Sequence, residues 1–162
     1  MTTAGDAVEA LRAAGATVAT AESLTGGLVC ATLVGVPGAS DVVRGGVAAY
    51  AADVKTSALG VPAALIAERG TVDADVAAAM AAGVRDRLGA TYGVSTTGVA
   101  GPGPAEGKPA GTVHVAVAGP AGVRTRLLEL AGDRAEIRAG TVDALLSWLV
   151  ATLGEESRHV RG

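Results

Sequence analysis

The 162-residue chain contains no phenylalanine, only one tryptophan and only two tyrosines. Single-stranded nucleic acids stack their bases on aromatic side chains, and both single strands and duplexes bind basic surfaces. Because aromatic residues are scarce and the formal net charge is −3, the sequence argues against DNA or RNA as a partner. Charged residues are also few, at 18%, but the apolar content of 49% is ordinary, which excludes a disordered charged tail.

Residues that bind metals or form disulfides are scarce as well. Cys30 is the single cysteine and has no partner within the chain, so we expect a reducing, cytoplasmic location. The two histidines, His114 and His159, are distant in sequence, and no tight carboxylate cluster accompanies them. We therefore expect no metal site.

Long apolar runs are missing too. Gly, Pro, Asp or Arg interrupts each run before it reaches the roughly 18 residues of a membrane-spanning helix, so we expect no membrane partner. The first 15 residues lack the basic start and apolar block of a signal peptide. At this length, and without repeats or linkers, we expect one domain over residues 1–162 with its core at about 6–152.

Apolar periodicity and turn residues divide the chain into alternating helices and strands. Strands are expected at residues 17–21, 46–50, 92–97, 113–118 and 123–130. Helices are expected behind Asp6, at 28–33, at 53–59, after Pro62, at 73–88 and from about Asp133, with a frayed tail beyond Gly154. This order predicts an α/β fold, a three-layer α/β/α sandwich with a mixed, mostly parallel sheet.

Ser23 lies where a predicted strand turns into a predicted helix, in the segment AESLTGG at residues 21–27. A hydroxyl near the positive end of a helix, next to the exposed backbone N–H groups of Thr25, Gly26 and Gly27, suits a nucleophile with an oxyanion hole. The alternative is that Ser23 or Thr25 is only the N-cap of the helix.

A nucleophilic serine needs a base, and neither His114, in a predicted strand, nor His159, in the tail, has the features of a triad member. Lys55 is one of two lysines and lies in a segment poor in other charges. Burial would lower the pKa of its amine and make it a base. The alternative is a solvated surface lysine.

A second candidate site is the Gly-rich segment TTGVAGPG at residues 96–103, followed by Lys108. It matches neither the P-loop nor the dinucleotide-binding fingerprint. Its backbone N–H groups could still bind a phosphate or carbonyl oxygen, with Lys108 as a nearby cation. The alternative is an ordered surface loop. The residues that we assign to substrate binding here are Thr97, Gly98, Val99, Ala100, Gly101, Gly103 and Lys108.

Two arginines, Arg134 and Arg138, lie four residues apart at the start of the last predicted helix. The helix dipole disfavours cations there unless an anion neutralises them, so they are candidates for binding a phosphate. Ion pairs with Glu129 or Glu136 would serve equally well. Arg44 is a weaker candidate.

Four segments together resemble one family. In order along the chain they are TVATAESLTGG (17–27), RGGVAAYAADVKTSALGV (44–61), TTGVAGPGPAEGKPAGTVHVAV (96–117) and AGDRAEIR (131–138). They resemble the C-terminal domain of the competence/damage-inducible protein A (CinA) family. Stand-alone members of that family deamidate nicotinamide mononucleotide to nicotinic acid mononucleotide and ammonia, and the resemblance implies a stand-alone member with a three-layer α/β/α fold.

The resemblance also implies roles for individual residues. The family's nucleophilic serine falls on Ser23, and its tyrosine and lysine fall on Tyr50 and Lys55. Ala51 and Ala52 replace the Ser-Asn pair that follows the tyrosine in the family, a departure that predicts weakened, altered or lost activity if that pair orients the lysine or the substrate. The Gly-rich loop and the Gly-Asp-Arg motif fall on Gly98–Gly103 and Gly132–Arg134.

The expected reaction is an acyl transfer without a metal or organic cofactor. Ser23 attacks the carboxamide, Lys55 takes and returns the proton, and Tyr50 relays that proton or fixes the lysine. A homodimer is the expected assembly. Two alternatives remain: a non-catalytic pyridine-nucleotide sensor, and an amidase for another small amide.

Overall fold

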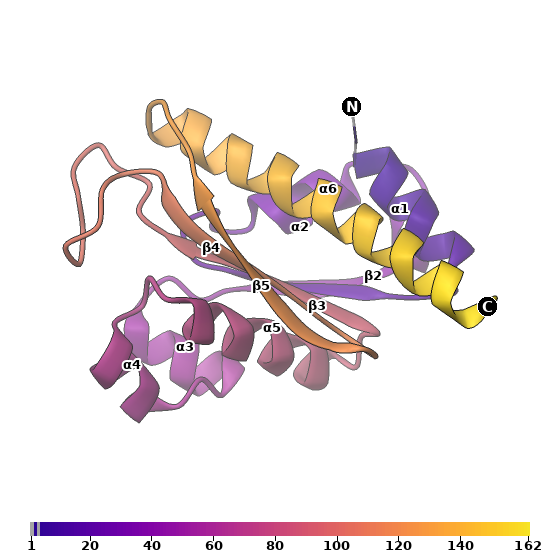
Figure 1. The fold of residues 1–162 in the computed structure, drawn as a ribbon, viewed down its shortest axis with the longest axis horizontal. Helices are drawn as coiled ribbons and strands as arrows, with labels where there is room; N and C mark the ends of the chain where they lie inside the picture. Colours follow the sequence, from indigo (N-terminus) through magenta and orange to yellow (C-terminus); the bar gives the residue numbers. More distant parts are fainter. Residues whose placement is uncertain (1, 3) are drawn as a thin grey trace.

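A five-stranded sheet forms the middle layer of the computed structural model, which describes residue 2 and residues 4–162 (Figure 1). The strand order is β2-β1-β3-β4-β5. β1 pairs in parallel with β2 and β3, whereas β4 is antiparallel to β3 and β5, so four of the five strands run in one direction. The expected mixed sheet is confirmed. Its strands are β1 (Val18–Glu22), β2 (Val43–Ala48), β3 (Tyr92–Gly98), β4 (Thr112–Gly119) and β5 (Gly122–Glu129).

Helices cover both faces of this sheet, as expected for a three-layer sandwich (Figure 1). One face carries α1 (Ala4–Ala13), α2 (Leu28–Val34) and α6 (Arg134–Val160). The other face carries α3 (Ala52–Leu59), α4 (Ala63–Arg69) and α5 (Ala74–Leu88). A 3-10 turn, η1 (Ala39–Asp41), precedes β2.

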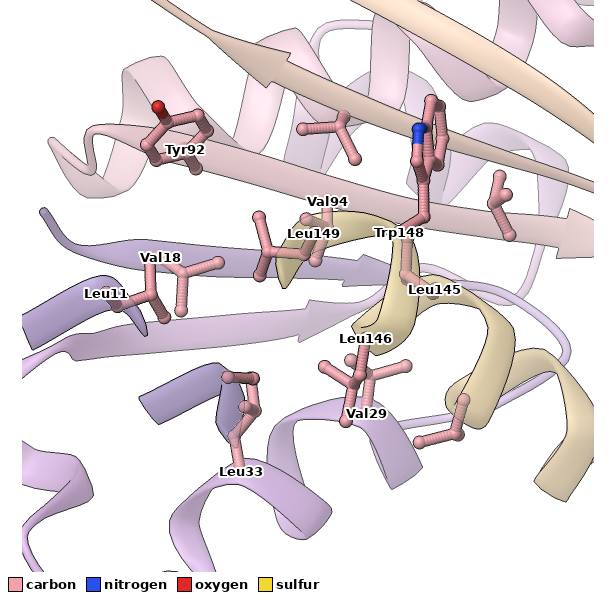
Figure 2. Packing of buried hydrophobic residues seen from close by; sticks show 14 of the residues in the cluster. Leu11, Val18, Val29, Leu33, Tyr92, Val94, Leu145, Leu146, Trp148 and Leu149 are labelled. Atoms are coloured by element: carbon pink, nitrogen blue, oxygen red, sulfur yellow. The ribbon is translucent and has the colours of Figure 1, made fainter. Parts of the chain in front are cut away.

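The two faces are packed with side chains of different size. Large residues such as Leu11, Leu33 and Leu149 fill the face under α1, α2 and α6 (Figure 2). Small residues dominate under α5, where Ala81 packs against the sheet and Gly93 of β3 lies so close to the Ala81 carbonyl that a Cβ would overlap it. The alanine and glycine content of the chain therefore permits a close contact between α5 and the sheet.

Most element boundaries lie within two residues of the expectation, but three differ by more. Asp6 lies inside the first turn of α1 instead of capping it, and β2 begins at Val43. The segment beyond Gly154 is helical to Val160 instead of frayed. Its last turns are held because Arg124 of β5 pairs with Glu155 at 3.3 Å and the Tyr92 hydroxyl donates to Glu156.

α6 is long and apolar enough, by length and mean hydropathy alone, to cross a membrane. Charged residues and glycine interrupt the apolar runs of α6, so the helix meets this criterion only on average hydropathy. Half of its apolar window is buried inside this fold, where Leu145 and Leu149 pack into the core. α6 is thus placed as the core helix of an α/β sandwich.

Candidate active site

Ser23 directly follows β1, at the edge of the sheet where the parallel strands β1, β2 and β3 end. Its backbone N–H donates to the Thr96 carbonyl oxygen at 3.0 Å and to Thr96 Oγ1 at 3.3 Å. The Thr25 and Thr96 hydroxyls are 2.8 Å apart. The turn that carries Ser23 is therefore fastened to β3. Thr96 begins the Gly-rich segment found in the sequence, but the sequence gave it no role in the site.

The N-cap alternative for Ser23 and Thr25 is wrong. The N-cap of α2 is Gly27, and no side-chain hydrogen bond caps that helix at this residue. The first turn of α2 is instead satisfied by Glu22, whose buried carboxylate accepts from the N–H groups of Val29 at 2.7 Å and Cys30 at 3.0 Å. A carboxylate just before a predicted helix is favoured by the helix dipole, which is the signal that could have identified Glu22.

Lys55 lies on α3 with its amine at the nucleophile. Its Nζ is 2.9 Å from Ser23 Oγ, 2.8 Å from the Ala49 carbonyl oxygen and 3.1 Å from the Tyr50 carbonyl oxygen. The side chain is 1% exposed, so the surface-lysine alternative is wrong. Burial lowers the pKa of Lys55, and the negative charge of Glu106 opposes this shift.

The two carbonyl groups decide how the amine of Lys55 is oriented. A neutral amine has two N–H bonds and one lone pair, and carbonyl oxygens only accept hydrogen bonds. If both N–H groups donate to Ala49 and Tyr50, the lone pair faces Ser23 Oγ. The hydroxyl of Ser23 then donates its hydrogen bond to Nζ, which is the geometry that a general base requires.

The backbone next to Ser23 offers two donors for an oxyanion instead of the three expected. The Gly26 N–H already donates to the Ser23 carbonyl oxygen at 3.1 Å, which removes it from the set. The N–H groups of Thr25 and Gly27 meet no acceptor in the described part of the chain. Gly27 adopts a φ of 107°, a left-handed conformation that favours glycine.

A cleft of about 310 Å³ adjoins the Ser23 turn at Leu24. Its size lies at the small end of the range for ligand pockets. Ser23 itself is not among the residues that line it. The lining consists of Leu24, Tyr50, Arg134 and residues 98–105.

Some of the backbone N–H groups that we expected to bind substrate in this cleft already donate to other acceptors. Gly98 belongs to β3, and the Val99 N–H donates to the Thr112 carbonyl oxygen at 2.8 Å. Ala100, Gly101 and Gly103 keep N–H groups without an acceptor among residue 2 and residues 4–162. These three donors therefore remain for a ligand in the cleft.

The two arginines of the last helix hold different parts of the site. Arg134 donates to the Gly101 carbonyl oxygen at 2.6 Å and contacts the Tyr50 hydroxyl at 3.3 Å, so it borders the cleft. Arg138 donates to the carbonyl oxygens of Leu24 at 2.9 Å and Thr25 at 3.0 Å. Arg138 thereby supports the Ser23 turn.

Neither arginine has an ion pair with Glu129 or Glu136 in the described residues. Arg44 does not join the site. Its side chain donates to the Leu88 carbonyl oxygen. Arg44 lies at the start of β2, at the opposite end from the site, because the neighbouring Val43 pairs with Val18 at the start of β1.

The Tyr50 side chain lies at the mouth of the cleft, and its residue is 67% exposed. Its hydroxyl bonds with Arg134 and its carbonyl oxygen with Lys55. This geometry does not match a proton relay through the phenol, but Tyr50 does fix the lysine through its backbone. Ala51 is the N-cap of α3 without a side-chain cap, and the contacts of the Lys55 amine on this side are the backbone carbonyl oxygens of Ala49 and Tyr50.

Two residues that we assigned to substrate binding lie outside the cleft lining. The Thr97 hydroxyl donates to the Thr71 carbonyl oxygen at 2.7 Å, in the connection between α4 and α5. Lys108 pairs with Ala105 at the tip of the loop. The sequence also gave no reason to select Glu106, whose carboxylate binds the backbone of Thr71.

Other features named from the sequence or found on the surface do not line the cleft beside Leu24. A hollow of about 730 Å³ lies between the β4–β5 turn and the end of α6, which also carries His159. His114 is on β4, where it pairs with Thr97. No three His, Cys, Asp or Glu side chains gather into a metal-binding group among the residues that the structure describes.

A serine hydroxyl thus lies beside a buried lysine, at the point where the parallel strands of an α/β/α sandwich end. This pairing is found in Ser–Lys acyl-transfer enzymes. Comparison with known proteins identifies the family. The chain belongs to the CinA C-terminal domain family, whose model matches residues 1–153.

Two relatives show how far the similarity extends. A CinA-like protein of Frankia casuarinae is 58% identical over 131 residues, which cover 81% of this chain and 30% of that protein. A CinA-like protein of Myxococcus xanthus is 47% identical over 134 residues, covering 81% and 32%. The chain thus spans about a third of the length of the curated relatives that it matches.

Solved structures with the same fold match over nearly their whole length. A CinA superfamily protein from Klebsiella pneumoniae has a TM-score of 0.92 at 29% identity, covering 94% of this chain and 96% of that one. A competence/damage-inducible protein from Agrobacterium tumefaciens has a TM-score of 0.84 at 36% identity, covering 95% and 99%. These structures support the fold assignment.

Proposed function

We propose that the chain is an amidohydrolase that deamidates nicotinamide mononucleotide to nicotinic acid mononucleotide and ammonia. The observation that carries the proposal is the 2.9 Å contact between Lys55 Nζ and Ser23 Oγ, with the lysine buried and oriented by two carbonyl groups. Membership of the CinA C-terminal domain family supports the proposal, and the resemblance to the stand-alone members of that family suggests the substrate.

The proposed reaction has two halves. The neutral amine of Lys55 takes the Ser23 proton while Oγ attacks the carboxamide carbon, and the developing oxyanion accepts hydrogen bonds from the Thr25 and Gly27 N–H groups. Lys55 then gives the proton to the departing nitrogen, which leaves as ammonia. Water hydrolyses the resulting ester, with Lys55 again acting as the base, and restores Ser23.

The cleft beside Leu24 provides the proposed binding site for the rest of the nucleotide. Its free N–H groups at Ala100, Gly101 and Gly103 suit phosphate oxygens, and Arg134 adds a guanidinium at its border. The nucleotide would thus extend from Ser23 along the Gly-rich loop.

Ser23→Ala tests the proposal directly. Ammonia release from nicotinamide mononucleotide should fall by at least about 10³-fold, because the covalent route is lost. Ser57→Ala is the matched control, since Ser57 lies exposed on α3, the helix of Lys55. Undiminished turnover by a folded Ser23→Ala protein would reject the nucleophile.

The sensor alternative rests on Ala51 and Ala52, which replace the polar pair of the family. It predicts that nicotinamide mononucleotide raises the melting temperature of the wild-type protein without any release of ammonia. Hydrolysis of another amide, with the nucleotide a poor substrate, would instead identify a different amidase.

A further inference from the structure

Glu106 reaches from the tip of the Gly-rich loop to the connection between α4 and α5. Its carboxylate accepts hydrogen bonds from the backbone N–H groups of Thr71 at 2.9 Å and Val72 at 3.3 Å, and from the Thr71 hydroxyl. Glu106 itself adopts a φ of 52°, a left-handed conformation that non-glycine residues rarely adopt. Glu106 and Gly107 form the tight turn that Ala105 and Lys108 close, and a turn of this kind takes a positive φ at both central residues. The turn presents the Glu106 side chain to Thr71 and Val72.

The same connection receives a second bond from the other end of the loop. Thr97, at the end of β3, donates to the Thr71 carbonyl oxygen at 2.7 Å. Gly70 leaves room for the Glu106 carboxylate, because a Cβ at this position would overlap it. Between Thr97 and Glu106 lies the segment 98–105 that lines the cleft. Both ends of the cleft wall are thus bonded to one short connection.

That connection joins helices packed against the one that carries Lys55. α3 contacts both α4 and α5. The Ser23 turn, by contrast, is fastened to β3. A bond between the loop and residues 71–72 therefore fixes the cleft wall relative to Lys55 as well as to Ser23.

We propose that Glu106 is a positioning residue that fastens the cleft wall to the α4–α5 connection, so that the cleft is formed before a substrate enters. The proposal rests on the proposed function for its kinetic consequences, but the fastening itself concerns the free protein. It assigns a role to a residue that does not touch the reacting atoms.

The carboxylate has a second effect through its charge. The hydrogen bonds from Thr71 and Val72 and the charge of Lys108 outweigh partial burial and hold the pKa of Glu106 below its usual value, so the group is ionised at neutral pH. The charged groups that interact electrostatically with it are Lys108 on its own loop and Lys55 on α3. Its negative charge favours the charged form of Lys55, which is inactive as a base.

Three variants distinguish the effect of the Glu106 hydrogen bonds from the effect of its negative charge. Glu106→Ala removes both, and we expect about a tenfold rise in KM for nicotinamide mononucleotide with a smaller change in kcat. Glu106→Gln keeps an amide that can bond with Thr71 but removes the charge. Its KM should stay within about threefold of the wild-type value, and the acidic limb of its activity profile should move to lower pH. Glu68→Gln, an exposed carboxylate on α4, is the matched control.

Hydrogen exchange of the free protein gives a readout independent of catalysis. Glu106→Ala should speed exchange at Thr71, Val72 and residues 99–111, whereas Glu68→Gln should not. Unchanged exchange in Glu106→Ala, or an unmoved pH profile together with an unchanged KM, would overturn the proposal. If the wild-type protein releases no ammonia, the proposed function fails while the exchange experiment still decides the role of Glu106.

Discussion

Replacing Lys55 with methionine removes the amine from Ser23 and keeps an unbranched side chain of similar shape in the buried space. The amine that lies 2.9 Å from Ser23 Oγ is then gone, and with it the proposed acceptor of the serine proton. General-base catalysis contributes about 10²–10⁴-fold to such reactions, so kcat for ammonia release should fall by that factor. KM should change little, because Lys55 does not line the cleft.

The same substitution has a calculable effect on stability. Methionine leaves the carbonyl oxygens of Ala49 and Tyr50 without their donor, at a cost of about 1–3 kcal/mol each. It also removes the cost of burying an amine, so the two effects oppose each other. Their balance depends on pH, because only the amine titrates.

The sign of that dependence follows from the lowered pKa of Lys55. Between this lowered value and the ordinary 10.5, the unfolded chain binds a proton at Lys55 that the folded protein does not. The stability of the wild-type protein therefore rises with pH in this window, by up to about 1.4 kcal/mol per pH unit. Below the window the amine is charged in both states and the full cost of burying the charge remains.

Urea unfolding of both proteins, from neutral to moderately alkaline pH, measures the difference. The free energy of unfolding of the wild-type protein should gain on that of Lys55→Met as pH rises. Activity of the wild-type enzyme should rise as pH passes through the lowered pKa of Lys55 and level off above it, since only the neutral amine accepts the Ser23 proton. A pH-independent difference in stability, or retained turnover by Lys55→Met, would refute the reasoning.

Two further predictions concern the arginines and two glycines. Arg134→Ala should raise KM for nicotinamide mononucleotide about tenfold and spare free nicotinamide, whereas Arg138→Ala should impair both substrates; equal losses in both variants would place the phosphate elsewhere. Gly83→Ala should destabilise the protein by about 2–3 kcal/mol, because a Cβ would overlap the Leu59 carbonyl, whereas Gly154→Ala should stabilise it by about 0.5–1 kcal/mol. Urea unfolding measures both, and similar effects would contradict the close packing of α5 on α3.

The order of elements could be predicted from the sequence because each signal is local. Asp73 caps α5 with its side chain, and Gly60 and Gly89 end α3 and α5 in left-handed conformations. The end of α6 could not be predicted, because Glu155 and Glu156 are held there by residues of β5 and β3 that are distant in sequence.

The candidate site, like the fold, could be predicted from the sequence only in part. Ser23 and Lys55 could be identified from motif and composition, but whether the lysine was buried depended on contacts between α3 and β1 that no local pattern reveals. Thr96 and Glu106 lie in segments noted from the sequence but were given no role, because each acts across the fold, on Ser23 and on Thr71. Backbone donors such as Gly26 and Val99 were misjudged because a sequence does not show which N–H groups already have acceptors.

The two buried ionisable residues beside Ser23, Glu22 and Lys55, differ in the partners that compensate their charges. Glu22 keeps two strong backbone donors, from Val29 and Cys30, at the positive end of α2, so its carboxylate is compensated where it lies. Lys55 has only neutral oxygens within hydrogen-bond distance, and a buried ammonium without a carboxylate partner is costly. A stabilising role alone would not retain such a lysine, since an apolar side chain of similar volume would avoid that cost. The compensated Glu22 therefore fits a structural role, and the uncompensated Lys55 fits the base of the proposed reaction.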